Sequence, residues 1–310
     1  MGYWEYFYGD NNISEKCISK IPILRTRQAN YLITSCKFNQ IDEKVIGLNT
    51  NSETKTLISI CDFSQIKTSS NTISSNEGNF VFYRSCCREA KQSSGLIEGV
   101  VLLITISNNN VINFHEESSI TNCGLLNTGN SIIYQKFGLI NIKQNNISNN
   151  KCNSQTSFEG YSYQVANITH CSFVNNEARI DECFDVEQKG PFNFYQCNMI
   201  NNNCSGRCFL LIASEANFDF CSFLDNNCPL IFYLKSGSKT PIMSHSSFNG
   251  NNQNVITQNM IYDYYNDLSN ILNNFCNFSS HLSLYIPCSC NCFSKYNLSY
   301  YILMINTIYD

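Results

Sequence analysis

Charged side chains are scarce in this sequence. Asp, Glu, Lys and Arg make up 14% of its 310 residues, against about 25% in an average globular protein. The formal net charge is −4, and no basic cluster offers the electrostatic surface that binds nucleic acid. We therefore expect no nucleic-acid partner. The hydrophobic fraction of 43% is still large enough to fill a core, which argues against a disordered chain.

A long apolar run is also missing. The most apolar stretches, Val100–Ile106 and Leu298–Tyr309, are shorter than the roughly 20 residues of a membrane helix. We expect the first to be a buried strand and the second to be a capping element or the stub of a longer span. The segment Met1–Asn12 lacks the charged and apolar regions of a signal peptide, which indicates another export route or a truncated gene model. We expect no membrane anchor in this chain.

Cysteine, by contrast, is abundant, with 18 residues. Such a count indicates an oxidising compartment or a structural use for a small apolar side chain. Six Asn-x-Ser/Thr sequons favour the oxidising compartment. They begin at Asn12, Asn146, Asn167, Asn203, Asn277 and Asn297. We therefore expect an extracellular or cell-surface protein.

The strongest pattern is an internal repeat of about 25 residues. The segments HCSFVNN, QCNMINN and FCSFLDN align at Cys171, Cys197 and Cys221, which are 26 and 24 residues apart. We call this aligned residue the anchor. The anchors are Cys36, Cys61, Cys86, Asn145, Cys171, Cys197, Cys221 and Ser246, with degenerate repeats around Ser118 and Cys276.

Columns of the alignment share residue types. Apolar residues three before the anchor are Ile33, Ile58, Tyr83, Ile142, Ile168, Phe194, Phe218 and Met243. Apolar residues two after it are Phe38, Phe63, Ile147, Phe173, Met199, Phe223 and Phe248. Asparagines five after it are Asn150, Asn176, Asn202, Asn226 and Asn251. A second apolar patch follows at Val45-Ile46, Leu96-Ile97, Cys183-Phe184, Phe209-Leu210, Ile231-Phe232 and Val255-Ile256.

These columns predict an all-β chain folded as a right-handed parallel β-helix solenoid of about ten coils. Strand residues two apart share a face, so the chain must bend between the minus-three position and the anchor. Asparagine suits a left-handed corner, and stacked asparagines can form a ladder of hydrogen bonds. The expected organisation is an N-terminal cap at residues 1–30, a repeat domain at 31–281 and a C-terminal cap or tail at 282–310.

A leucine-rich-repeat solenoid is the alternative fold. Its period of 20–29 residues and its apolar spacing also fit Ile168, Cys171, Phe173 and Asn176. Leucine is scarce at these positions, however, and the segments between them favour strands over helices. Helices filling half of each repeat would support this alternative.

The segments CSFVNNEA, CNMINNNC and CSFLDNNC resemble the Phe-x-x-Asn repeats of bacterial polymorphic outer-membrane proteins. They resemble still more the Cys-x-Phe-x-x-Asn coils of large surface-protein families in parasitic protists. The resemblance covers residues 33–280, although the companion Gly-Gly-Ala-Ile motif is missing. It implies a β-helix with a role in adhesion or surface coating and no catalysis.

The sequence contains no recognisable catalytic motif. The Asn-Thr-Asp, Asp-Asp, Gly-His-Gly and Arg-Ile-Lys motifs of polygalacturonase-like enzymes, which share the pectin-lyase-like fold, are missing. His170 and His245 precede the anchor, where a solvated corner is expected. We predict no catalytic, metal-binding or cofactor-binding residues and no cofactor.

The densest acidic cluster contains Asp181, Glu182, Asp185 and Glu187, with Arg179 beside it. A calcium site is conceivable there because alternate carboxylates suit oxygen ligation. One repeat later stand Arg207 and Leu211 rather than acids. We therefore interpret the cluster as an isolated charged corner.

The cysteines form two predicted columns. The anchor cysteines should stack inward, mostly as free thiols, although neighbouring coils are close enough for disulfides. Cys152, Cys204 and Cys228 each lie seven after an anchor and form a second column. The tail group Cys288, Cys290 and Cys292 does not have zinc-ligand spacing.

The function expected from the sequence is that of a noncatalytic interaction scaffold, with a cell-surface protein or a glycan as its partner. A carbohydrate-active lyase or hydrolase on the same fold is one alternative, and a leucine-rich-repeat recognition protein is another.

Overall fold

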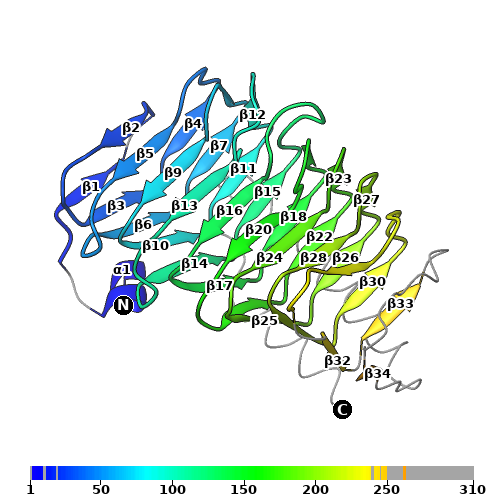
Figure 1. The fold of residues 1–310 in the computed structure, drawn as a ribbon. Coiled ribbons are helices and arrows are strands. Elements are labelled where there is room, and N and C mark those ends of the chain that lie inside the picture. The colour runs from blue at the N-terminus through cyan, green and yellow to red at the C-terminus, as the bar shows by residue number, and fades with distance from the viewer. Residues whose placement is uncertain are drawn as a thin grey trace, which may run out of the picture.

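The computed structural model describes residues 2–9, 12–18, 20–238, 241–244, 246–249 and 261–262. The strands stack side by side along one long axis, and each pairs in parallel with its counterparts in the neighbouring coils (Figure 1). The result is the predicted all-β parallel β-helix. Three long sheets run along the solenoid, and we name them sheets A, B and C.

Sheet A contains, in spatial order, β1 (Glu15–Cys17), β3 (Tyr31–Thr34), β6 (Lys55–Ser59), β10 (Asn79–Tyr83), β14 (Ile112–Glu116), β17 (Leu139–Lys143), β21 (Ala166–Thr169), β25 (Pro191–Tyr195), β29 (Glu215–Asp219), β32 (Ile242–Ser244) and β34 (Ile261–Tyr262). Sheet B contains β2 (Ile23–Arg25), β5 (Ile46–Asn49), β9 (Ile73–Asn76), β13 (Leu102–Thr105), β16 (Ile133–Lys136), β20 (Phe158–Tyr161), β24 (Phe184–Glu187), β28 (Leu210–Ile212) and β31 (Phe232–Leu234).

Sheet C contains β4 (Lys37–Asn39), β7 (Asp62–Ser64), β11 (Cys86–Arg88), β15 (Ser119–Thr121), β18 (Asn146–Ser148), β22 (Ser172–Val174), β26 (Asn198–Ile200), β30 (Ser222–Leu224) and β33 (Ser247–Asn249). Two short sheets complete the corner after sheet C, and they contain β8 (Lys67–Thr68), β12 (Lys91–Gln92), β19 (Lys151–Cys152), β23 (Glu177–Ala178) and β27 (Asn203–Cys204).

The described residues form about eight coils, which is fewer than the ten expected. One reason is that coil length varies. Phe82 pairs with His115, 33 residues further along the chain, because residues 93–101 form a longer connection between β12 and β13. The predicted strand at Val100–Ile106 is confirmed as β13.

The leucine-rich-repeat alternative is wrong. Within the described ranges the only helix is α1 (Tyr3–Tyr8), which precedes the repeats. It lies against the outer face of sheet A (Figure 1), where Trp4 packs with Leu57 and Val81. The Tyr8 hydroxyl donates to the carbonyl oxygen of Thr56 at 2.6 Å. This helix covers an apolar stretch of sheet A that would otherwise face water.

Phenylalanine and isoleucine columns fill the core as predicted. In the column two after the anchor, Phe63, Phe173 and Phe223 are at most 1% exposed. Phe173 pairs with Ile147 on one side and Met199 on the other. The second apolar patch is confirmed except at Leu96-Ile97, which is exposed, since Leu102 is the residue that pairs with Ile73.

The anchor assigned to the third coil is wrong by one residue. Cys86 pairs with Asp62, so the anchor of that coil is Ser85, and Phe82 replaces Tyr83 in the column three before it. The fully buried Cys87 then takes the place of phenylalanine in the core. Three small residues in succession, Ser85-Cys86-Cys87, concealed the correct register.

Cys171, Cys197 and Cys221 stack in adjacent coils, as predicted. The backbone N–H of Asn198 donates to the carbonyl of Cys171, and that of Ser222 donates to Cys197, both within 2.9 Å. The thiol of Cys171 donates at 3.2 Å to the carbonyl of Thr169, and that of Cys197 donates at 3.2 Å to Ile168. These thiols therefore satisfy backbone oxygens as well as filling space.

The second cysteine column is interrupted, because Ala178 lies between Cys152 and Cys204. Cys204 forms a disulfide with Cys183 of the preceding coil, with their Cα atoms 6.2 Å apart. The sequence predicts that disulfides can join neighbouring coils. In the one formed here, Cys183 belongs to the second apolar patch and not to a cysteine column.

Left-handed backbone occurs at two corners of each coil, immediately before the anchor and four residues after it. His170 and Asn175 are examples, with φ of 55° and 54°. The bend expected before the anchor is thus confirmed. The ladder asparagines were expected to make the second corner themselves, but each follows the left-handed residue by one position.

The asparagine ladder is confirmed inside that corner. Asn176 donates from its amide nitrogen to the carbonyl of Ile147 at 2.9 Å and to the side-chain oxygen of Asn202 at 3.1 Å. Its own oxygen accepts from the backbone and the side chain of Asn150. Asn202 repeats these contacts with Phe173 and Asn226. The ladder therefore satisfies backbone groups that the corner turns inward.

Several predicted positions lie outside the described residues. They are Val255-Ile256, Asn251, His245, Cys276, Asn277, the tail cysteines Cys288, Cys290 and Cys292, Asn297 and the segment 298–309.

Replacing Phe173 with alanine should lower the free energy of unfolding by about 3–5 kcal/mol, because the lost transfer energy and the cavity add. Chemical denaturation measures this. Val165→Ala, at a position 48% exposed, is the control and should change stability by less than about 0.5 kcal/mol. A Phe173→Ala loss below about 1 kcal/mol would contradict the packing described.

Asn176→Ala should cost about 2 kcal/mol or more, because it leaves several buried backbone and amide groups without partners. The neighbouring Asn175→Gly is the matched control. Asn175 is exposed and left-handed, a conformation that glycine adopts readily, so its stability should stay near that of the parent. Equal losses for both variants would show that the ladder does not stabilise the corner.

Candidate functional site

The outer face of sheet B carries a row of residues that the register aligns across five coils. Tyr134 pairs with Glu159, which pairs with Asp185. Leu211 and Tyr233 continue the row. Two carboxylates therefore lie next to each other on adjacent strands, between apolar and aromatic neighbours.

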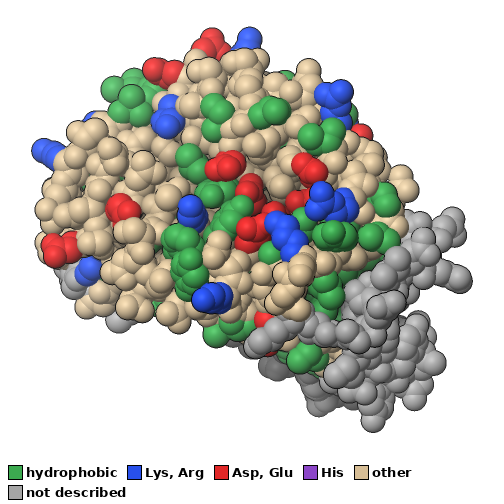
Figure 2. Space-filling view, in the orientation of Figure 1, with side chains coloured by type: hydrophobic (Ala, Val, Ile, Leu, Met, Phe, Trp, Pro, Cys, Tyr) green, Lys and Arg blue, Asp and Glu red, His purple; other side chains and the backbone are tan. Residues whose placement is uncertain are grey.

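A second row lies two residues further along each strand, on the same face. Lys136 pairs with Tyr161, and Tyr161 pairs with Glu187. Lys235, just after β31, forms an ion pair with Glu187. We call the two rows together the sheet B patch; it comprises Tyr134, Lys136, Glu159, Tyr161, Asp185, Glu187, Leu211, Tyr233 and Lys235. In Figure 2, acidic side chains gather near the middle of the visible face with basic side chains beside them.

The interpretation of the acidic cluster as isolated is wrong. Leu211 does follow Asp185 by one coil, as predicted. One coil earlier, however, Glu159 lies directly beside Asp185. The sequence does carry a signal for this pair, since Glu159 stands 26 residues before Asp185, the length of one repeat.

The other charged residues near Asp185 take different places. Asp181 accepts a hydrogen bond from the hydroxyl of Ser154. Glu182 accepts from the amide of Gln155 at 3.1 Å. The Arg207 guanidinium lies 5.0 Å from the ring centre of Tyr233. Arg207 is thus brought to the edge of the patch, whereas Arg179 is an exposed residue of the preceding corner.

Burial and like charge keep the two adjacent carboxyls protonated to unusually high pH. Burial, reinforced by Glu98, raises the pKa of Glu159 to about 7. Burial, with further contributions from Glu187 and Glu182, raises the pKa of Asp185 to about 8. Strongly raised carboxyl pKa values are typical of functional sites.

Each of these carboxyls also has an unsatisfied oxygen. The hydroxyl of Tyr161 donates to Glu159 Oε1 at 3.1 Å, but the buried Oε2 has no hydrogen-bond partner. The buried Oδ1 of Asp185 has none either. Both residues are only 5% exposed. Buried polar atoms normally find partners, so this pair stands out in the patch.

Metal ligation has no candidate group in the described part of the chain, where no three His, Cys, Asp or Glu side chains are placed to hold an ion. What the patch offers is a pair of acceptors that can also carry protons.

The two histidines among the described residues lie away from the patch. His170 is an exposed corner residue, as predicted, with its ring edge against Tyr195. His115 instead replaces an apolar residue in the core between Phe82 and Ile142. Its burial lowers its pKa to about 3, and neither ring nitrogen has a hydrogen-bond partner. It is therefore a neutral core residue.

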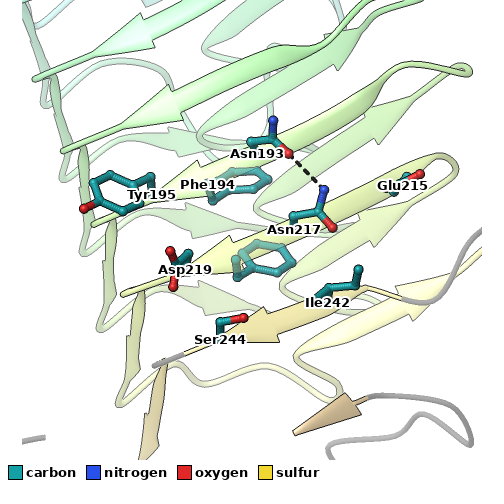
Figure 3. Close-up of a pocket in the computed structure, with 9 residues that line it drawn as sticks. Asn193, Phe194, Tyr195, Glu215, Asn217, Asp219, Ile242 and Ser244 are labelled. Carbon is teal, nitrogen blue, oxygen red and sulfur yellow. Dashed lines mark hydrogen bonds between the residues drawn. The ribbon is translucent and has the colours of Figure 1, made fainter. Parts of the chain in front are cut away.

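A second candidate is a shallow hollow of about 430 Å³ on sheet A, lined by residues of β25, β29 and β32 (Figure 3). Asn217 donates to the side-chain oxygen of Asn193 at 2.9 Å across it. Tyr195 and Asp219 line one side. Asn193 donates in turn to Asn167 at 3.3 Å, and the side-chain oxygen of Asn217 has no hydrogen-bond partner. The hollow lacks the adjacent carboxyls of the sheet B patch, which is why we rank it second.

No protein-family model, curated protein or solved structure matches this chain. Among the residues described, no helix has the length and apolar character needed to cross a membrane.

Neutralising the buried carboxyls should stabilise the protein at alkaline pH. A carboxyl with a raised folded-state pKa contributes most below its unfolded value, near 4, and this contribution is lost as pH rises through the folded value. Asp185→Asn should therefore gain at least about 1.4 kcal/mol over the parent at pH above about 8, the equivalent of one pKa unit, and little at pH below about 4. Denaturation across this range measures it.

The exposed Glu43 provides the control, and Glu43→Gln should change stability by less than about 0.5 kcal/mol. Parallel curves for the parent and Asp185→Asn would show that Asp185 ionises as it does in water.

Proposed function

We propose that this protein is a noncatalytic interaction scaffold of the cell surface or extracellular space, and that its sheet B patch binds an extended glycan. The observation that carries the proposal is the run of tyrosines and carboxyls aligned along the solenoid axis. Binding sites combine aromatic surface with a few convergent polar groups, and this flank has both.

The regularity of the flank favours a periodic polymer. Strands stack about 4.8 Å apart, a spacing comparable with the length of one sugar ring in an extended polysaccharide. A chain lying along the axis would meet the tyrosines and carboxyls in register. A bound peptide usually pairs with a free strand edge, whereas β20 and β24 are paired on both sides.

The surroundings support an extracellular setting. The Cys183–Cys204 disulfide fits an oxidising compartment. Of the sequon asparagines, Asn167 is exposed and could carry a glycan, whereas Asn146 is buried. The resemblance of the repeats to bacterial polymorphic outer-membrane proteins and protist surface proteins favours an adhesive role.

One observation favours a second function, that of an enzyme acting on polysaccharides. Glycoside hydrolysis uses two carboxyl groups, one of them protonated. Asp185, with its raised pKa, and the ion-paired Glu187 lie two residues apart on one face. Scaffold binding remains our conclusion because the sequence carries none of the polygalacturonase-type catalytic motifs.

Binding of the full-length protein to immobilised neutral, uronic-acid and amino polysaccharides tests the proposal. We expect retention of at least one polymer without release of reducing ends. Tyr233→Ala, on the patch, should weaken binding about tenfold, or 1.4 kcal/mol. Tyr195→Ala, on sheet A and similarly exposed, should not.

Release of reducing ends that stops on Asp185→Asn would establish the enzyme instead. Failure to retain any polymer would refute glycan binding.

A further inference from the structure

The sheet B patch contains more carboxyl groups than cations to pair with them. Glu187 is paired with Lys235. Neither Glu159 nor Asp185 has an ion pair among the described residues, and Lys136 lies over the ring of Tyr161, 5.9 Å from its centre. In the described part of the chain, neither of these two adjacent acidic groups thus has a cation in direct contact, although the charge of Lys235 acts on Asp185.

The patch already shows how it accommodates an ammonium group. The Nζ atom of Lys235 contacts Glu187. Burial acts to lower the pKa of Lys235, but this hydrogen bond and the nearby charges of Asp185 and Glu182 raise it overall. The ammonium form is therefore favoured at this face of β24.

We infer that Glu159 and Asp185 together bind the primary ammonium group of an amino sugar within the glycan. This rests on the proposed function and specifies its substrate class. An ammonium group has three donors, which suits the unpartnered oxygens of Glu159 and Asp185. The terminal torsion of a carboxylate is broad and roughly two-fold, so rotation of Asp185 can exchange its two oxygens toward the ligand.

The neighbouring groups favour a cation over an anion. The titratable and charged residues that face the pair from adjacent strands and connections are Glu98, Tyr134, Tyr161, Glu182, Glu187, Arg207 and Lys235. A uronic acid would add another carboxylate to this set, and a neutral sugar would leave both acids unpaired. Among these three classes of sugar, the amino sugar is the one that supplies a positive charge.

Ammonium binding should also displace protons. Both carboxyls hold protons at mildly acidic pH, because their pKa values are raised to about 7 and about 8. An incoming cation favours the ionised forms, so these protons pass to the buffer as the complex forms.

Calorimetric titration of the full-length protein with a glucosamine oligomer, its N-acetylated counterpart and oligolysine tests this inference at mildly acidic pH. We expect the glucosamine oligomer to bind at least tenfold more tightly than the acetylated one. Its heat should differ between two buffers of different ionisation enthalpy, reporting proton release. The double variant Glu159→Gln, Asp185→Asn should remove both the preference and the proton release.

This variant should remain folded, because its amides replace carboxyls that are already mostly protonated and uncharged at mildly acidic pH. Glu43→Gln should behave as the parent. Equal affinity for both sugar oligomers, still weakened by Tyr233→Ala, would overturn the amino-sugar inference and leave glycan binding intact. Binding of neither, together with no polysaccharide retained, would overturn both. Oligolysine that binds as tightly and is lost in the same double variant would show that the partner is a basic protein.

Discussion

The solenoid depends on how it satisfies the backbone at its two left-handed corners. From β4 to β30, a left-handed residue on either side of each three-residue strand of sheet C turns N–H and C=O groups toward the interior. Buried backbone groups without partners are costly. Cysteine, serine or asparagine follows the corner before each of these strands, where a small side chain can bond these groups. At the corner after the strand the same holds from Cys123 onward, whereas apolar Ile41, Ile66 and Ala90 stand there in the first three coils. Cys171 and Asn176 occupy the two such positions of one coil.

Repetition of these corners fixes the register between coils. The anchor N–H of Cys61 donates to the hydroxyl of Ser85, and that of Ser85 donates to Ser118. On the other corner, Cys123 donates to the side chain of Asn150. Since both corners are locked to the next coil, differences in coil length are confined to the connections around sheet B. The longer connection at residues 93–101 shows this.

The contrast between fixed corners and variable connections explains what could be predicted from the sequence. The columns around Cys171 and Phe173 follow the locked corners, so their spacing revealed the fold, the ladder and most of the core. The third coil was misplaced because Ser85 and Cys86 are both acceptable at an anchor, and only the pairing with Asp62 distinguishes them.

The candidate site was less predictable, because its residues come from different coils. Glu159 and Asp185 become neighbours only through the register, and no local motif joins them. The raised pKa of each depends on burial and on like charges from residues that are distant in sequence, such as Glu98 for Glu159. Composition showed few charges but not that several of them share one face.

Helix α1 has a consequence for how the chain is assembled during synthesis. Its aromatic residues pack on Leu57 and Val81 and approach Phe114, so its docking surface is complete only after about 100 further residues have been made. At roughly 5–20 residues per second, that interval is about 5–20 s. Throughout it, Trp4 and its neighbours remain uncovered on the nascent chain, where they can attract chaperones. Helix α1 would thus find its place only after the strands that it covers have been made.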